Sequence, residues 1–132
     1  MRILIPLLAV ALSGSAVAAD SAMQRQTDEQ KLAAELNGLV PDKPVDCIDR
    51  YQASQTQAYG GTILYKVSRS LIYRNDTGGG CENMARGDIL VTESISGRLC
   101  RGDIGRTVSP SIHAPTGSCA LGSFVAYRKA PK

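Results

Sequence analysis

The spacing of hydrophobic positions divides the chain into three stretches with different patterns. Residues 3–12 form an almost unbroken apolar run. Further on, Leu32, Leu36 and Leu39 recur at helical spacing, which indicates an amphipathic helix. From Cys47 onward, short alternating segments are separated by glycine, proline and serine, as is typical of strands and turns. This order predicts one helix followed by a mainly β domain.

The predicted helix runs from Asp28 to Asn37. The capping box Thr27-Asp28-Glu29-Gln30 predicts its start, because the threonine hydroxyl can accept the amide proton three residues on. Asn37-Gly38, with two prolines shortly after, predicts its end. The apolar side of this helix can pack on the β domain or dock on a partner. We expect it to pack on the domain.

Strand patterns follow in the second half of the chain, and the clearest lie at residues 62–67, 71–74, 88–95 and 121–127. Ile63, Tyr65 and Val67 share one face of the first of these strands. Another shared face is predicted for Ile89, Val91 and Ile95, and residues 109–117 are predicted to form a loop. The pattern predicts an α+β, mainly β fold: a small antiparallel barrel-like or sandwich sheet with one N-terminal amphipathic helix, stapled by disulfides.

The first 18 residues have the three parts of a secretory signal peptide. Arg2 precedes the apolar run, and Ala16-Val17-Ala18 fits the cleavage rule, which predicts a cut before Ala19 or before Asp20. The alternative is a membrane anchor, but the apolar run is too short to span a bilayer. Ser15 stands where a lipidated cysteine would be. We therefore expect a periplasmic or secreted protein with no transmembrane span in the mature chain.

Four cysteines follow the predicted signal peptide, at Cys47, Cys81, Cys100 and Cys119. An even number of cysteines in an exported chain predicts disulfides, and four allow three pairings. We favour Cys47–Cys81 with Cys100–Cys119, because each pair then closes a short local unit. A zinc site is the weaker interpretation, since there is no C-x-x-C motif and His113 is the only histidine.

The charge of the chain excludes little, but it argues against a nucleic-acid partner. The net charge is +3, and it falls to +2 once Arg2 is removed with the signal peptide. This excess is too small for nucleic-acid binding. The local basic excess is the tail at residues 128–132, which is more typical of a solvated chain end than of a contact with an anionic surface. We predict no cofactor, and another envelope protein is the partner we consider.

Two residues are candidates for catalysis. Asp76-Thr77-Gly78 is the triplet of aspartic proteases, whose chemistry needs two such aspartates sharing a proton. His113 could form a triad with a nearby serine, Ser109 or Ser111, although its loop is bounded by prolines.

Arg-Gly-Asp also occurs twice, ending at Asp88 and at Asp103, either as an adhesion ligand or as a turn before a strand. We expect the turn.

Three cysteine contexts recur in order along residues 45–127: Cys47-Ile48, Leu99-Cys100-Arg101-Gly102 and Cys119-Ala120-Leu121-Gly122. This order resembles a family of small exported proteobacterial proteins known only as a domain of unknown function. The resemblance implies an envelope location and a compact cysteine-containing fold, and it implies no activity.

The predicted organisation has four parts: a signal peptide (1–18), a polar segment with the helix and a linker (19–44), a cysteine-containing β domain (45–127) and the basic tail (128–132). We interpret the chain as a non-enzymatic binding or structural protein of the bacterial envelope. The alternative hypothesis is a small periplasmic hydrolase that uses Asp76 or His113.

Overall fold

A computed structural model describes residues 16–132 of the chain. The predicted signal peptide lies largely outside these residues, so its cleavage stays a prediction. The elements follow the order α1 (Ala16–Glu35), β1 (Leu39–Pro41), β2 (Cys47–Asp49), η1 (Arg50–Gln52), β3 (Gln55–Tyr59), β4 (Thr62–Ser68), β5 (Leu71–Asp76), η2 (Glu82–Arg86), β6 (Ile89–Thr92), β7 (Arg98–Cys100), β8 (Ile104–Val108), β9 (Pro115–Ala120) and β10 (Phe124–Lys129).

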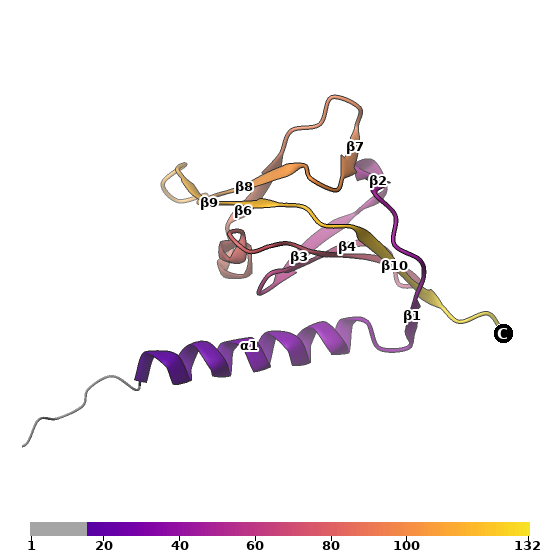
Figure 1. Ribbon diagram of the computed structural model, residues 1–132, viewed down its shortest axis with the longest axis horizontal. Helices are drawn as coiled ribbons and strands as arrows, with labels where there is room; N and C mark the ends of the chain where they lie inside the picture. The colour runs from indigo at the N-terminus through magenta and orange to yellow at the C-terminus, as the bar shows by residue number, and fades with distance from the viewer. Residues whose placement is uncertain (1–15) are drawn as a thin grey trace, which may run out of the picture.

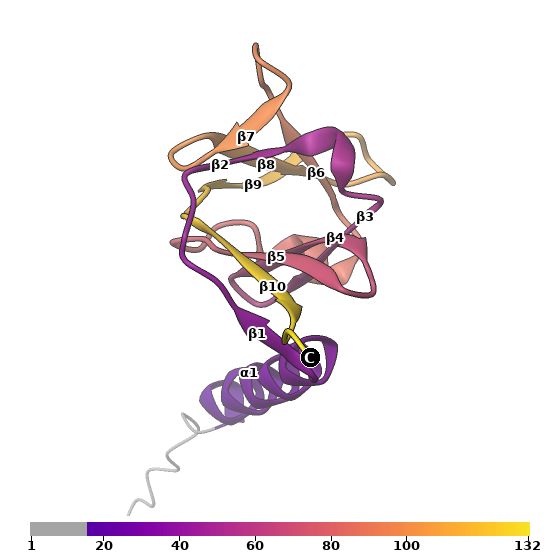
Figure 2. The ribbon, with the colours of Figure 1, turned by 90° about the vertical axis from the view of Figure 1, so that its right-hand side faces the viewer.

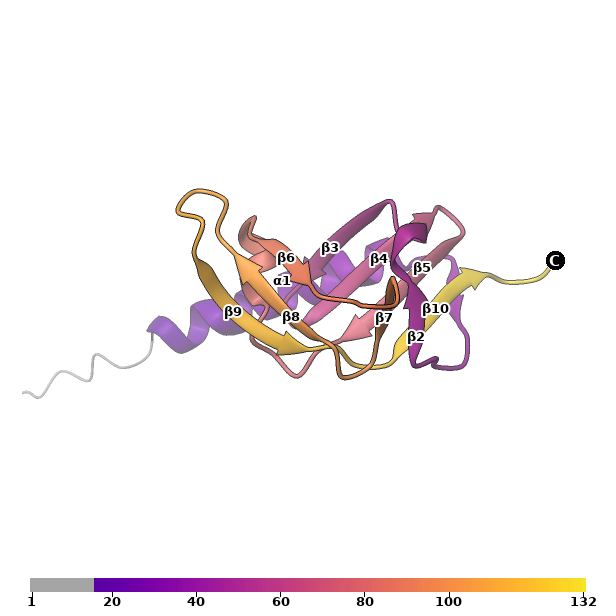
Figure 3. The same cartoon turned by 90° about the horizontal axis from the view of Figure 1, so that it is seen from above.

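The strands form antiparallel sheets stacked in two layers, with the helix as a third layer. The largest sheet has five strands in the order β1-β10-β5-β4-β3, and the smaller sheets are β2-β7 and β6-β8-β9. Figure 2 shows α1 below the five-stranded sheet and the smaller sheets above it. In Figure 3 the smaller sheets overlie the large one, with α1 on the far side. The mainly β, antiparallel, sandwich-like prediction is thus confirmed.

Two hydrophobic clusters cover the two faces of the five-stranded sheet. Ile63 and Tyr65 of β4 pack against the smaller sheets, together with Phe124. Leu64, between them in the sequence, points to the other face and meets Leu36 of the helix. Successive side chains of a strand alternate between faces, so a strand covered on both sides is buried at every position. This alternation explains the unbroken buried run from Thr62 to Tyr65.

Helix α1 (Figure 1) begins earlier than the sequence predicts and ends close to the predicted residue. The predicted start at Thr27 is wrong: its hydroxyl donates to the Met23 carbonyl, 3.0 Å away, one turn back in the same helix. Alanine, glutamine, arginine and methionine, which favour helices, extend α1 through the residues before Thr27. Gly38, at φ +77°, follows its end.

The helix packs on the β domain through its C-terminal half, as expected. Leu32 and Leu36 are buried in the cluster below the sheet. Beside them, Glu35 accepts hydrogen bonds from Lys66 Nζ at 2.8 Å and from the Tyr59 hydroxyl at 3.0 Å. The hydrogen bond and charge of Lys66 hold the pKa of Glu35 below its usual value, outweighing partial burial. Apolar and ionic contacts therefore join α1 to β3 and β4.

The disulfides are Cys47–Cys100 and Cys81–Cys119, so the favoured pairing of sequence neighbours is wrong. Cys47 and Cys100 face each other across the β2–β7 pair, with Cα atoms 4.0 Å apart. Cys81 precedes η2 and is bonded to Cys119 of β9. Both bonds connect elements that the sheets bring together from distant parts of the sequence.

Three further sequence predictions, one each for a loop, a strand and the C-terminal tail, also need correction. The predicted loop at residues 109–117 overlaps β9, which begins at Pro115. The predicted strand at 121–127 is interrupted, because the buried Asn75 side chain exchanges two hydrogen bonds with the Gly122 backbone, at 2.7 and 2.9 Å. The last strand, β10, continues to Lys129 beside β1, so the basic tail is partly ordered in the sheet.

Candidate functional site

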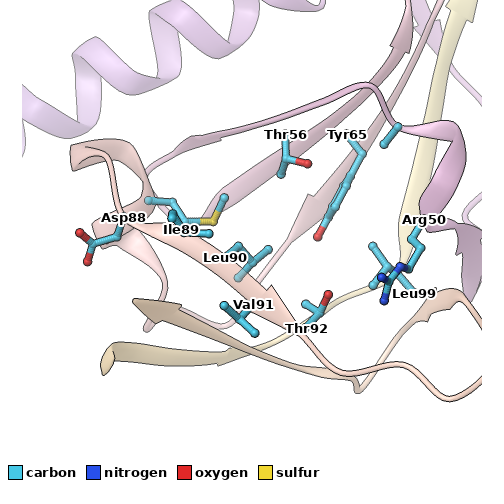
Figure 4. Close-up of a pocket in the computed structure, with 11 residues that line it drawn as sticks. Arg50, Thr56, Tyr65, Asp88, Ile89, Leu90, Val91, Thr92 and Leu99 are labelled. Carbon is cyan, nitrogen blue, oxygen red and sulfur yellow. The ribbon is translucent and has the colours of Figure 1, made fainter. Parts of the chain in front are cut away.

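A cleft of about 530 Å³ opens between the edges of the two β layers. One side is formed by β6 and the other by β3 and β4, while β7 and the two short helices η1 and η2 close the ends (Figure 4). Its lining mixes apolar and polar side chains, and more of the exposed lining is polar than apolar: Arg50, Ala53, Thr56, Tyr65, Met84, Asp88, Ile89, Leu90, Val91, Thr92 and Leu99.

Five consecutive residues, Asp88 to Thr92, line the cleft from the side of β6. If the cleft lay against one face of this strand, every second residue would line it, because side chains alternate between faces. A consecutive run therefore means that the cleft follows the edge of the strand. β6 pairs only with β8 within its sheet, so the main-chain groups that point away from β8 are directed toward the cleft.

Tyr65 supplies an unpaired polar group in the wall of the cleft. The residue is 3% exposed, and its hydroxyl makes no hydrogen bond with any part of the chain that the structure describes. Figure 4 shows its oxygen directed toward the side on which Leu90, Thr92 and Leu99 lie. Its ring packs at a tilt on Phe124, 5.7 Å between centroids. Burial raises the pKa of Tyr65 far above its ordinary value, so this hydroxyl remains a proton donor.

Opposite charges mark the two ends of the cleft (Figure 4). At one end the Arg50 guanidinium lies over the Tyr51 ring, 5.1 Å from its centroid. η1, which carries both residues, is capped by Asp49, whose carboxylate accepts the Tyr51 amide proton at 2.9 Å. At the other end the Asp88 carboxylate accepts a hydrogen bond from the Thr116 hydroxyl. Arg50 is exposed and Asp88 is half-buried.

Each disulfide fixes one end of the cleft. Cys47–Cys100 joins β2 to β7 and so positions Leu99, which precedes one cysteine in β7, and η1 with Arg50, which follows β2. Cys81–Cys119 holds the start of η2, whose Met84 lines the other end. Cross-links at both ends pre-organise the cleft.

Close packing behind β6 holds its position. Gly87 ends η2 in the left-handed region, at φ +104°, and turns the chain into the strand. Leu90 fills the space left by Gly105 of β8, where an added Cβ would come within 2.8 Å of the leucine side chain. Behind the strand, Thr107 of β8 is fully buried. Glycine at 105 is thus needed for Leu90 to point inward between the layers.

Leu90 points inward, between the layers. Ile89 and Val91, which are predicted to share one face with Ile95, are 55% and 46% exposed, and Ile95 is fully exposed. The strand also ends at Thr92, three residues before Ile95. Ile89 and Val91 therefore lie on the outer face of the sheet, along the edge of the cleft.

The two predicted catalytic residues lie outside this cleft. Asp76, at the end of β5, accepts hydrogen bonds from the Thr62 hydroxyl at 2.6 Å and from Arg74 Nε at 3.0 Å. His113 lies in the exposed turn between β8 and β9, at φ +54°. The cleft lining includes neither residue. Sequence reasoning identified neither Tyr65 nor Arg50 as a binding residue. Tyr65 belongs to the alternating apolar pattern of a core strand, and Arg50 belongs to no recognisable motif.

Both Arg-Gly-Asp triplets form turns before a strand, as predicted. Gly87 and Gly102 have φ angles of +104° and +90°, and β6 and β8 begin directly after the aspartates. The Asp103 carboxylate accepts the Cys100 amide proton at 2.8 Å, which stabilises the second turn. Asp88 of the first triplet has the additional position at the end of the cleft.

Comparison with protein-family models, curated proteins and solved structures finds no match for this chain. Within residues 16–132, no three histidine, cysteine or acidic side chains gather in a way that could hold a metal ion. No helix in that part of the chain has both the length and the apolar character needed to cross a membrane. The cleft is accordingly interpreted from its own geometry.

Proposed function

We propose that this chain is an exported binding protein of the bacterial envelope and that the cleft between β3 and β6 is its ligand site. The Tyr65 hydroxyl carries the proposal, because it is buried in the cleft wall and unpaired within the described chain. A buried hydroxyl without a partner is costly, and native structures seldom keep one without a reason. A ligand that brings a hydrogen-bond acceptor into the cleft supplies the missing partner.

The lining defines the chemistry of this ligand. Leu90, Met84 and Leu99 provide apolar surface around the Tyr65 hydroxyl. Polar groups set beside apolar ones in a pre-formed cavity are typical of binding sites, where the polar groups orient the ligand. We therefore propose a ligand with apolar surface and a carbonyl or carboxylate oxygen. The function is binding without catalysis, since the hydrolase hypothesis rests on Asp76 and His113, which lie elsewhere.

The location belongs to the same proposal. Two disulfides support an oxidising compartment such as the periplasm or the extracellular space. The signal-peptide pattern of residues 1–18 and the resemblance of residues 45–127 to small exported proteobacterial proteins support the same location. We propose cleavage near Ala18/Ala19.

The proposal is tested by titrating the oxidised protein with small amides, carboxylic acids and capped dipeptides while recording amide NMR spectra. We expect at least one compound to shift Tyr65, Leu90 and Leu99. The matched variant Tyr65→Phe keeps the ring and removes the hydroxyl. Its affinity for that compound should fall about tenfold, the upper range for one neutral hydrogen bond. Shifts elsewhere only, or equal affinities in the two proteins, would contradict the proposal.

A further inference from the structure

We propose that the ligand of this cleft is an extended polypeptide segment that adds to the free edge of β6 as an antiparallel strand. The inference rests on the proposed function of the cleft and adds the chemical class of its partner. Three observations carry it: the edge of β6 along the cleft, the alternation of surfaces on its two sides and the charges at its ends.

The edge supplies main-chain donors and acceptors in a row. Residues 88–92 line the cleft consecutively, which places the strand edge along it. Such a row is matched by the main chain of an extended peptide, and adding a strand to a sheet edge is a recurrent mode of peptide recognition. The sheet of β6 is antiparallel throughout, and antiparallel pairing is the more stable arrangement.

The two sides of the edge suit the alternating side chains of a strand. Toward the core, one set of peptide side chains would meet Leu90, Leu99 and the Tyr65 hydroxyl. Toward solvent, the other set would extend the exposed surface formed by Ile89 and Val91. Peptides with small β-branched residues at alternating positions fit both surfaces.

The charged ends give the peptide a direction. Asp88 lies at the start of β6, and Arg50 lies beyond its end, next to Leu99 and Thr92 (Figure 4). An antiparallel peptide therefore begins near Arg50 and ends near Asp88. An acidic residue at its start and a basic residue at its end, with about four residues between them, would meet opposite charges. Ion pairs at the rim of a binding site contribute modestly to affinity and more to orientation.

The test uses the peptide acetyl-Glu-Val-Thr-Val-Thr-Lys-amide with the oxidised protein, read by amide NMR, hydrogen exchange and calorimetry. We expect saturable binding, slower exchange of amides in Ile89–Thr92 and shifts at Tyr65. A peptide with the glutamate and lysine exchanged is the charge control and should bind more weakly. Two further peptides are N-methylated, one at both valines and one at both threonines. Alternate amides point to opposite edges of a strand, so one of these two should lose at least tenfold in affinity and the other should not.

The outcomes separate this inference from the proposed function. If small amides or acids shift Tyr65 but the peptide does not bind, the strand-addition inference fails and the cleft remains a binding site. If both N-methylated peptides bind as well as the parent, edge pairing is overturned. If the protein self-associates with β6 protected from exchange, the edge belongs to a second copy and the peptide proposal is wrong. If no probe shifts Tyr65, both proposals fail.

Discussion

Replacing Tyr65 by phenylalanine should make the free protein more stable while weakening ligand binding. The substitution removes one oxygen from a side chain that is 3% exposed and whose hydroxyl has no hydrogen-bond partner in the described chain. The packing of the ring on Phe124, 5.7 Å away, is retained. An unpaired buried hydroxyl costs about 1–3 kcal/mol. The small void left by the oxygen offsets part of this, so we expect a net gain of about 1 kcal/mol.

The sign of this change is measured by thermal and denaturant unfolding with the disulfides intact. For a domain of this size, 1 kcal/mol corresponds to a rise of about 3–6 °C in Tm. Tyr59→Phe is the matched control, because the Tyr59 hydroxyl donates to Glu35 at 3.0 Å. Glu35 is a third exposed, so losing this bond should cost only about 1 kcal/mol. If Tyr65→Phe destabilises the protein as Tyr59→Phe does, the hydroxyl is satisfied in the free protein and our reasoning is refuted.

The remaining predictions concern the helix and the cross-links. Leu36→Ala should destabilise the protein by about 2–3 kcal/mol in denaturant unfolding, because it opens a void between α1 and the sheet; a loss below about 0.5 kcal/mol would contradict that packing. Because the pKa of Glu35 is lowered in the folded protein, Glu35 contributes to folding stability above the usual carboxyl pKa, and this contribution is lost as pH falls through the lowered pKa. The hydrogen-exchange protection factors of the α1 amides, which correct for the intrinsic exchange rate at each pH, should therefore fall in acid, and Glu35→Gln should remove that dependence. The pKa of Tyr59 is raised to about 12, mainly by burial, so the contribution of this residue to folding stability is complete below pH 10 and is lost as pH rises toward 12. Ultraviolet titration of the tyrosines should show the raised midpoint, and an ordinary midpoint for Tyr59 would refute it. Replacing Cys47 and Cys100 by serine opens a link that spans 53 residues, so stability should fall by about 4 kcal/mol, and an unchanged unfolding midpoint would oppose the assigned role of this bond.

The fold class could be predicted from the sequence because it depends on local patterns. The helix, the β4–β5 hairpin and the turns at Gly87 and Gly102 follow from periodicity and glycine placement. The disulfide pairing could not be predicted, because it depends on which strands become neighbours. Cys47 meets Cys100 only after β2 and β7 pair across the fold.

The helix start shows how a local signal can be overridden. Thr27 has the residues of a capping box after it, but the residues before it are good helix formers and contain no breaker. A capping signal in the interior of such a segment has no helix end to cap. The Thr27 hydroxyl instead donates a hydrogen bond to the carbonyl of Met23 in the preceding turn.

The cleft was not predictable from sequence for a related reason. Tyr65 belongs to the alternating pattern of a core strand, and the pattern correctly places it inside. Whether its hydroxyl finds a partner depends on the groups that β6, η2 and β7 place opposite it. Likewise, Ile89 and Val91 have a core-like pattern, yet Gly105 makes room for Leu90 and turns the other two outward.

The central claim is that the Tyr65 hydroxyl donates a hydrogen bond to an acceptor of a ligand bound in the cleft. It is tested most directly by calorimetric Kd values of the tightest-binding NMR probe for the wild-type protein and for Tyr65→Phe. We predict about tenfold weaker binding by the variant, although that variant is the more stable protein. Equal Kd values in the two proteins would contradict the claim.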